Sequence, residues 1–224
     1  YTITGLMILV TLYPMYFVLI ASISNPTDVS AGNITFYPID ITFKGYQKLF
    51  DYPQLWTGYG NTILYALFGT VFSLIANIPA AYALSRRDLV GRRFFTVFFL
   101  IPMFFTGGLI PTFMVVNSLK LTNTIWALIL PGAVPLGNVI LLMNAFRGVP
   151  KSLEEAAMID GGSQWVILLK VFLPVVKPTL AAVTLFTIVG HWNDYFSALV
   201  YITDTANYPL QTYIQQLNVD ITEV

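Results

Sequence analysis

Five polar residues near the end of the chain have side chains that could bind a polar solute in apolar surroundings. His191 is the only histidine of the chain, and Asp194 is the only charged residue within the long apolar segments. Hydroxyl, imidazole and carboxylate groups exchange hydrogen bonds with a hydroxyl-rich solute. At about 100° per residue, all five fall within an arc of roughly 100° on a single helix. They are Thr184, Thr187, His191, Asp194 and Tyr195.

Three interpretations of this polar stripe remain open. The first is the wall of a solute pathway, because ionisable groups within a span are costly and usually face a cavity or partner. The second is hydrogen bonding between helices of a membrane bundle. The third is simple hydration, because Asp194 lies about 24 Å along the helix from Pro178, towards one membrane surface.

A second set of charged residues occupies a short segment between two apolar stretches. Ser152 and Glu155 have the spacing of a capping box, and Gly161 can end the helix through a left-handed C-cap. This pattern predicts a helix over 152–160. Small residues that permit close approach alternate there with charged ones: Glu154, Glu155, Ala156, Ala157 and Asp160.

A second short helix is predicted over 163–173. Pro174 should stop it, and Pro178 suits the first turn of the next helix. From physics alone, the two helices could also form an amphipathic helix–turn–helix that merely lies on the membrane.

The composition defines the elements that must position these residues. The chain is 56% hydrophobic and only 10% charged, which is typical of a protein within lipid. The net charge of zero argues against a nucleic-acid surface. One histidine, no cysteine and no convergent acidic cluster leave no catalytic or metal site to predict.

The apolar stretches predict an all-α polytopic helix bundle. A span needs about 20 mostly apolar residues. Five spans are predicted, near 2–24, 61–84, 95–117, 124–146 and 179–202. The segments 25–60 and 203–224 are predicted to lie on one side, and 147–178 on the other. A sixth span is expected but is not present in this sequence.

The distribution of basic residues predicts the orientation. Eight of the eleven Lys and Arg residues lie in the second and fourth loops. The positive-inside rule therefore places both loops in the cytoplasm, with residue 1 also on that side. The basic residues concerned are Arg86, Arg87, Arg92, Arg93, Arg147, Lys151, Lys170 and Lys177.

The spacing of Glu155-Ala156-Ala157, Gly161 and Leu173-Pro174 resembles the EAA loop of permease subunits from ATP-binding-cassette importers. Further segments resemble the carbohydrate-type permeases, and Gly107 to Pro111 resembles the subgroup serving alginate and other complex saccharides. These further segments are Ala80 to Leu84, Phe146 to Pro150 and Trp192 to Tyr195.

This resemblance implies the type I importer permease fold and a sugar substrate. It implies that the EAA loop, including Glu154, Glu155, Ala156, Ala157, Asp160, Gly161, Leu173 and Pro174, docks on an ATPase subunit. The implied partners are two ATPase subunits, an external solute-binding protein and a second permease, in a heterodimer within the lipid of the cytoplasmic membrane. No Gly-x-x-x-x-Gly-Lys-Ser/Thr loop is present, so ATP and Mg are expected on the ATPase and no cofactor on this chain.

Two other functions are weighed against this one. A secondary transporter would couple Asp194 and His191 to a proton, and the loop would then be merely structural. A membrane-bound enzyme would need acid–base or metal ligands, and the composition offers few.

Overall fold

The computed structural model describes residues 2–222, and the side chains of residues 2–216. All regular elements in these residues are helical, which confirms the predicted all-α class. They are α1 Thr2–Ser22, α2 Pro26–Ser30, α3 Lys44–Phe50, α4 Pro53–Ser85, α5 Arg92–Phe104, α6 Leu109–Ser118, α7 Ile125–Ile129, α8 Leu136–Arg147, α9 Lys151–Ile159, α10 Gln164–Ile167, η1 Leu168–Phe172, α11 Leu173–Val175, α12 Lys177–Asn193, α13 Phe196–Tyr201, η2 Thr205–Asn207 and α14 Leu210–Thr222.

The first compact unit comprises residues 1–56. Tyr13 and Tyr16 on α1 donate hydrogen bonds to the carbonyls of Thr35 and Phe36, so α1 holds the loop that follows α2. Most other side chains of α1 are exposed apolar groups. Such a helix needs an apolar surrounding along most of its length, as a bilayer provides.

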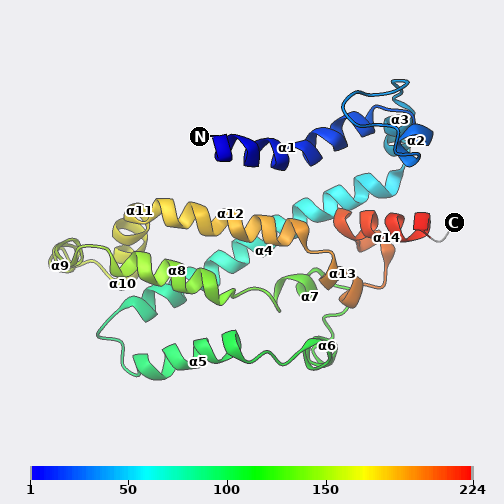
Figure 1. Ribbon diagram of the computed structural model, residues 1–224. Coiled ribbons are helices and arrows are strands. Elements are labelled where there is room, and N and C mark those ends of the chain that lie inside the picture. The colour runs from blue at the N-terminus through cyan, green and yellow to red at the C-terminus, as the bar shows by residue number, and fades with distance from the viewer. Residues whose placement is uncertain (1, 223–224) are drawn as a thin grey trace. The chain divides into compact units, whose positions relative to one another are not determined.

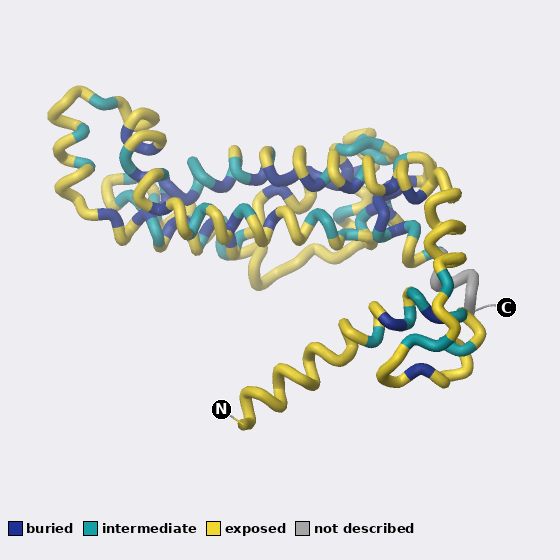
Figure 2. The backbone as a smooth tube through the Cα atoms, turned by 90° about the horizontal axis from the view of Figure 1, so that it is seen from above, coloured by how far each residue is buried: buried dark blue, intermediate teal, exposed yellow. Residues whose placement is uncertain are grey.

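The second unit, residues 57–224, is a bundle in which α8 packs against both α12 and α5 (Figure 1). Its larger core joins α4, α8, η1 and α12, and the buried residues form a continuous line along these helices (Figure 2). Ala81, Leu142, Ile167 and Val183 are fully buried there. A smaller core joins α7 and α13.

The helices of greatest length and apolarity in the described residues are α1 and α4. Either helix alone is long enough to cross a bilayer. Neither α5 nor α6 is long enough alone. The two pass the same test together, but they are bent by 116° at a break before Leu109. Gly108 in this break has φ +84°, a backbone conformation that is strained for any residue with a side chain. The predicted single span over 95–117 is therefore two helices.

The predicted span over 124–146 is also interrupted. The chain is non-helical between α7 and α8, where Pro131 and Pro135 both lack the backbone N–H that a helix needs. Pro135 stands directly before α8 as its N-cap. These two prolines interrupt the predicted span, whereas Pro14 and Pro79 lie within continuous helices.

The predicted helix over 179–202 ends early. α12 stops at Asn193, and α13 starts at Phe196. Asp194 Oδ1 accepts the backbone N–H of Ser197 at 3.1 Å, so its carboxylate satisfies an amide at the start of α13. Asp side chains compete with helical hydrogen bonds in this way. The prediction that Asp194 and Tyr195 continue the polar stripe on one helix is therefore wrong.

The segment predicted as an external tail contains structure. Residues 205–207 form the short helix η2, and α14 follows from Leu210. Asn61 donates to the carbonyls of Ala206 and Tyr208 at 2.9 and 3.0 Å, and Thr62 accepts the Leu210 N–H at 2.8 Å. These bonds fix the start of α14 against α4.

Candidate functional site

The helix α9 carries most of the predicted contact residues. It spans Lys151–Ile159 and lies at one end of the bundle (Figure 1). Its N-cap is Pro150, and no side chain caps it, so the predicted capping box at Ser152 is wrong. A proline at the N-cap sets an extended entry but offers no acceptor, and Ser152 is already within the helix.

The end of α9 is as predicted. Gly161 has φ +77°, and its N–H bonds Met158 O at 3.0 Å. Gly162 N–H bonds Ala157 O at 2.9 Å, which completes a Schellman motif. A Cβ at Gly162 would lie 2.7 Å from this same carbonyl oxygen. Both glycines are therefore required for the sharp turn into α10.

The second predicted helix is confirmed in place but differs in its geometry. α10, the π-helical η1 and α11 run without interruption from Gln164 to Val175, and this run meets α12 at 88°. Leu173 N–H bonds Leu168 O, five residues back, and Pro174 follows with no N–H to donate. The prediction that Pro174 stops the helix is wrong, because the wide turn of η1 accommodates this proline.

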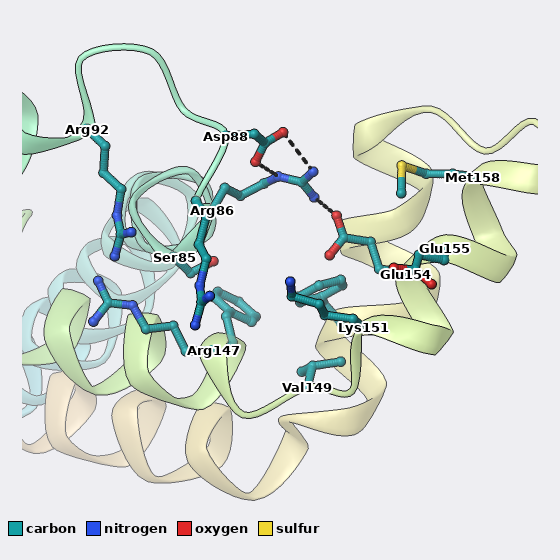
Figure 3. A pocket seen from close by; sticks show the side chains of 13 residues that line it. Ser85, Arg86, Asp88, Arg92, Arg147, Val149, Lys151, Glu154, Glu155 and Met158 are labelled. Carbon is teal, nitrogen blue, oxygen red and sulfur yellow. Dashed lines mark hydrogen bonds and ion pairs between the residues drawn. The ribbon is translucent and has the colours of Figure 1, made fainter.

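Arg86 joins the end of α4 to α9. Its guanidinium forms an ion pair with Glu154 on α9 and a bidentate pair with Asp88, at 3.0 and 3.1 Å (Figure 3). Donation of hydrogen bonds to Asp88 raises the pKa of Arg86, and acceptance of the same bonds lowers the pKa of Asp88. Arg86 and Asp88 are therefore both charged at neutral pH, so Glu154 contacts a permanent cation.

A second link runs through Tyr82, one turn before Arg86 on α4. Its hydroxyl donates to Gln164 Oε1 on α10 at 2.8 Å and accepts from Arg86 at 3.1 Å. Its ring packs edge-on against Phe146 and Phe172, with centroids 5.9 and 5.1 Å away. The three aromatic residues tie α4, α8 and η1 together. We name Tyr82, Arg86, Glu154 and Gln164 the α4–α9 clamp.

The clamp was not predicted. Arg86 entered the sequence argument only as a positive charge, and Tyr82 only through a resemblance. Their partners lie 68 and 82 positions away along the chain, and a single sequence carries no signal of such pairings.

The remainder of α9 faces away from the bundle. Of the predicted contact residues, only Glu154 and Ala157 are partly buried on α9, and Leu173 is partly buried against the core. Ile159 is 86% exposed, and Trp165 at the start of α10 is 62% exposed. The other predicted contact residues are exposed: Glu155, Ala156, Asp160, Gly161 and Pro174. An apolar surface with acidic residues thus projects from the bundle end.

The polar stripe residues do not form one surface. Thr187 is buried and accepts from Asn138 Nδ2 on α8 at 3.1 Å. The His191 ring lies against Gly69 on α4, where an added Cβ would be only 2.6 Å from Nε2. Thr184 is partly buried and donates to Leu180 O in its own helix. Tyr195 is 40% exposed, beside the helix break.

Three comparisons with known proteins identify the class. Residues 69–222 match the family described as binding-protein-dependent transport system inner membrane component. Protein LplC of Bacillus subtilis is 36% identical over 94% of this chain and 71% of its own length. The polygalacturonan/rhamnogalacturonan transport system permease protein YtcP of the same organism is 36% identical over 93% of this chain and 73% of its own.

A solved structure is similar over nearly the whole chain. It is the crystal structure of a bacterial ABC transporter involved in the import of the acidic polysaccharide alginate. The TM-score is 0.93 at 37% identity, and the match covers 98% of this chain and 78% of that one.

The chain therefore belongs to the family of binding-protein-dependent transport system inner membrane components. It is a multi-pass permease subunit of an ABC importer in the cytoplasmic membrane, and it is not itself catalytic. The predicted resemblance to carbohydrate-type permeases is confirmed, and the predictions of a secondary transporter and of an enzyme are not supported. An ABC importer of this type works with an ATPase and a binding protein.

Proposed function

We propose that α9 and the start of α10 transmit force between an ATPase subunit and the spans. The observation that carries this proposal is the division of α9 into two faces. Glu154 and Ala157 face the bundle, while Ile159 and the neighbouring Trp165 are left without cover. A displaced α9 pulls α4 through the α4–α9 clamp, because the Arg86–Glu154 pair and the Tyr82–Gln164 bond join these elements.

The orientation and the remaining partners belong to the same proposal. The bundle end with α9 faces the cytoplasm, because the basic loops gather there and ATP is available there. With the five crossings predicted from the sequence, residue 1 is proposed to lie on the cytoplasmic side as well. Two ATPase subunits bind ATP and Mg, while this chain binds no cofactor. A different permease chain completes a heterodimer, and an external binding protein delivers the solute.

Single cysteines test the orientation, because the chain has none of its own. Val90 is 90% exposed in the loop between α4 and α5, and Tyr37 is 79% exposed in the loop after α2. In intact cells, Tyr37→Cys should react with a membrane-impermeant maleimide and Val90→Cys should not. Permeabilised cells provide the control, because both should react there. The reverse pattern in intact cells would contradict the orientation.

We propose an oligosaccharide as the solute. The support is similarity to a permease named for polygalacturonan and rhamnogalacturonan and to a transporter of the acidic polysaccharide alginate. The test is uptake into proteoliposomes that contain the whole importer and its binding protein. Radiolabelled oligogalacturonides should enter only when ATP and Mg are present on the side of the vesicle membrane that carries α9. Collapse of a proton gradient should leave this uptake unchanged. Uptake driven by a proton gradient without ATP would refute the proposal.

We also propose that the break after α12 lines the solute route. Non-helical backbone at membrane depth is tolerated where it is buried in protein or lines a water-filled cavity. Tyr195 is exposed at this break, and Asp194 is beside it. Of the other stripe residues, Thr184 lies one turn before Thr187. Thr187 and His191 serve instead as contacts between α12 and its neighbours, since both pack on adjacent helices.

Asp194 would then both accept the Ser197 N–H at the helix break and line the solute route, and two substitutions separate these roles. Asp194→Asn keeps an oxygen acceptor for the Ser197 N–H, so the helix break persists and uptake should fall by no more than about twofold. Asp194→Leu removes the acceptor at a cost of about 1 kcal/mol and should lower uptake much further. Uptake and the amount of assembled importer are measured together. Normal uptake by both variants would remove Asp194 from the route.

A further inference from the structure

A pocket of about 520 Å³ lies between the loop after α4, the end of α8 and α9 (Figure 3). Five basic and three acidic residues line it. Two of the acidic ones, Asp88 and Glu154, are both paired with Arg86. Among the described residues, no carboxylate forms an ion pair with the other lining cations: Arg87, Arg92, Arg147 and Lys151.

Arg147 lies close enough to Arg87 and Arg92 for their like charges to act on it. Arg147, at the end of α8 outside the spans, has a pKa lowered first by burial and then by the charges of Arg92 and Arg87. Arg92 uses one N–H on the Leu84 carbonyl at 3.2 Å, and Arg147 donates to the sulfur of Met143 at 3.2 Å. We name Arg87, Arg92 and Arg147 the arginine trio. Their remaining guanidinium N–H donors favour an anion with several acceptor oxygens.

An apolar groove begins next to the arginine trio. Leu84 and Met143, which the trio contacts, line a cavity of about 180 Å³ between α5 and α8. Phe99 and Leu136 of this cavity also line a further one of about 510 Å³, whose other walls are equally apolar. No residue of α5 is buried, and those that line the cavity, Thr96, Phe99 and Leu100, are only partly covered.

The length of the groove matches one leaflet. From Arg147 back to Leu136, α8 rises by about 16 Å. Half of the hydrocarbon core of a bilayer is about 15 Å thick. A phosphate bound to the trio would therefore have an apolar channel as deep as a single acyl layer beneath it. A soluble phosphate would use the trio but leave the groove empty.

We propose that the arginine trio and the α5–α8 groove bind one anionic phospholipid, with its phosphate on the guanidinium groups and an acyl chain between the helices. Charge complementarity selects the headgroup, and a basic pocket between helices at the cytoplasmic side is suited to anionic headgroups. The lipid would fill the space between α5 and α8 next to the α4–α9 clamp. Glu154, Glu155 and Met158 of α9 line the same pocket, so the lipid would lie beside the element proposed to contact the ATPase.

The test uses the assembled importer in nanodiscs and two photoreactive lipids with a diazirine in the acyl chain. One is a phosphatidylglycerol and the other a phosphatidylcholine. After illumination, peptides are mapped by mass spectrometry. We expect phosphatidylglycerol adducts on residues 96–103 and 136–143, and several-fold fewer from phosphatidylcholine. Equal labelling by both lipids, or no adducts in these segments because another subunit covers them, would overturn the proposal.

Arginine variants make the test specific to the headgroup site. Arg147→Gln should reduce the phosphatidylglycerol adducts roughly fivefold, and Arg87→Gln should add a similar factor. Arg92 is kept, because it also satisfies the end of α4. Arg93→Gln is the matched control, since Arg93 is exposed and does not line the pocket. If Arg147→Gln fails to assemble, the exposed Arg87 carries the test alone. Adduct levels that are the same in Arg87→Gln and Arg93→Gln would refute the role of the trio.

Discussion

Glu154→Arg should abolish the stimulation of ATP hydrolysis by the loaded binding protein. The substitution places a second guanidinium beside Arg86 at a contact where both side chains are less than one-fifth exposed. Loss of the pair and the added repulsion should cost on the order of 2 kcal/mol at the joint between α9 and α4. The spans are unchanged, so the importer should still assemble. ATPase activity of the reconstituted complex, with and without binding protein, is the measurement.

A compensated variant separates charge from shape. Glu154→Arg combined with Arg86→Glu and Asp88→Asn restores one opposite pair and removes the carboxylate that would repel the new glutamate. Stimulation should recover in large part. If stimulation is normal in Glu154→Arg alone, the Arg86–Glu154 pair does not transmit motion. If it is lost equally in both variants, the acidic side chain at position 154 contacts the ATPase directly.

Gly69→Leu should destabilise the importer strongly. A Cβ at Gly69 would lie 2.6 to 2.8 Å from three atoms of the His191 ring. Atoms do not approach so closely, so α4 and α12 must move apart or the ring must leave its place. Overpacking of this kind costs about 1–3 kcal/mol. The melting temperature of the assembled complex should fall by several degrees.

Gly60→Leu is the matched control on the same helix, because nothing lies within 4 Å of the Cβ position there. It should leave the melting temperature nearly unchanged. His191→Ala combined with Gly69→Ala should recover part of the stability lost in Gly69→Ala, since the clash disappears. Equal melting temperatures for Gly69→Leu and Gly60→Leu would show that the close approach of α4 and α12 is not required.

Local patterns predicted the coupling segment well. Two adjacent glycines after an apolar and acidic helix specify a left-handed end, and Gly161 has this conformation. Apolar length predicted α1 and α4, because a helix of this composition has few alternatives in lipid. The family resemblance added the permease class, which the comparisons confirm, whereas the role of residues 151–175 in ATPase coupling stays a prediction.

Predictions failed where one residue had two possible uses. Asp194 suits a polar stripe by its spacing, yet its carboxylate is used for the Ser197 amide and the helix ends. Ser152 suits an N-cap, yet Pro150 already begins the helix. Hydrogen bonds between residues far apart in the sequence could not be predicted for another reason. Asn123 bonds Thr203 and Asp204, about eighty positions away, and no local pattern distinguishes this asparagine from one in an ordinary turn.

The π-helical turn at Leu168–Phe172 sets an angle as well as accommodating a proline. Such a turn holds one residue more than an α-helical turn, and one residue corresponds to about 100° of rotation about the helix axis. Deleting the exposed Leu169 would close the turn into regular α-helix and rotate α9 relative to α12 by about that angle. The direction in which α9 presents its exposed face is therefore determined by the number of residues in η1, without any change in α9 itself.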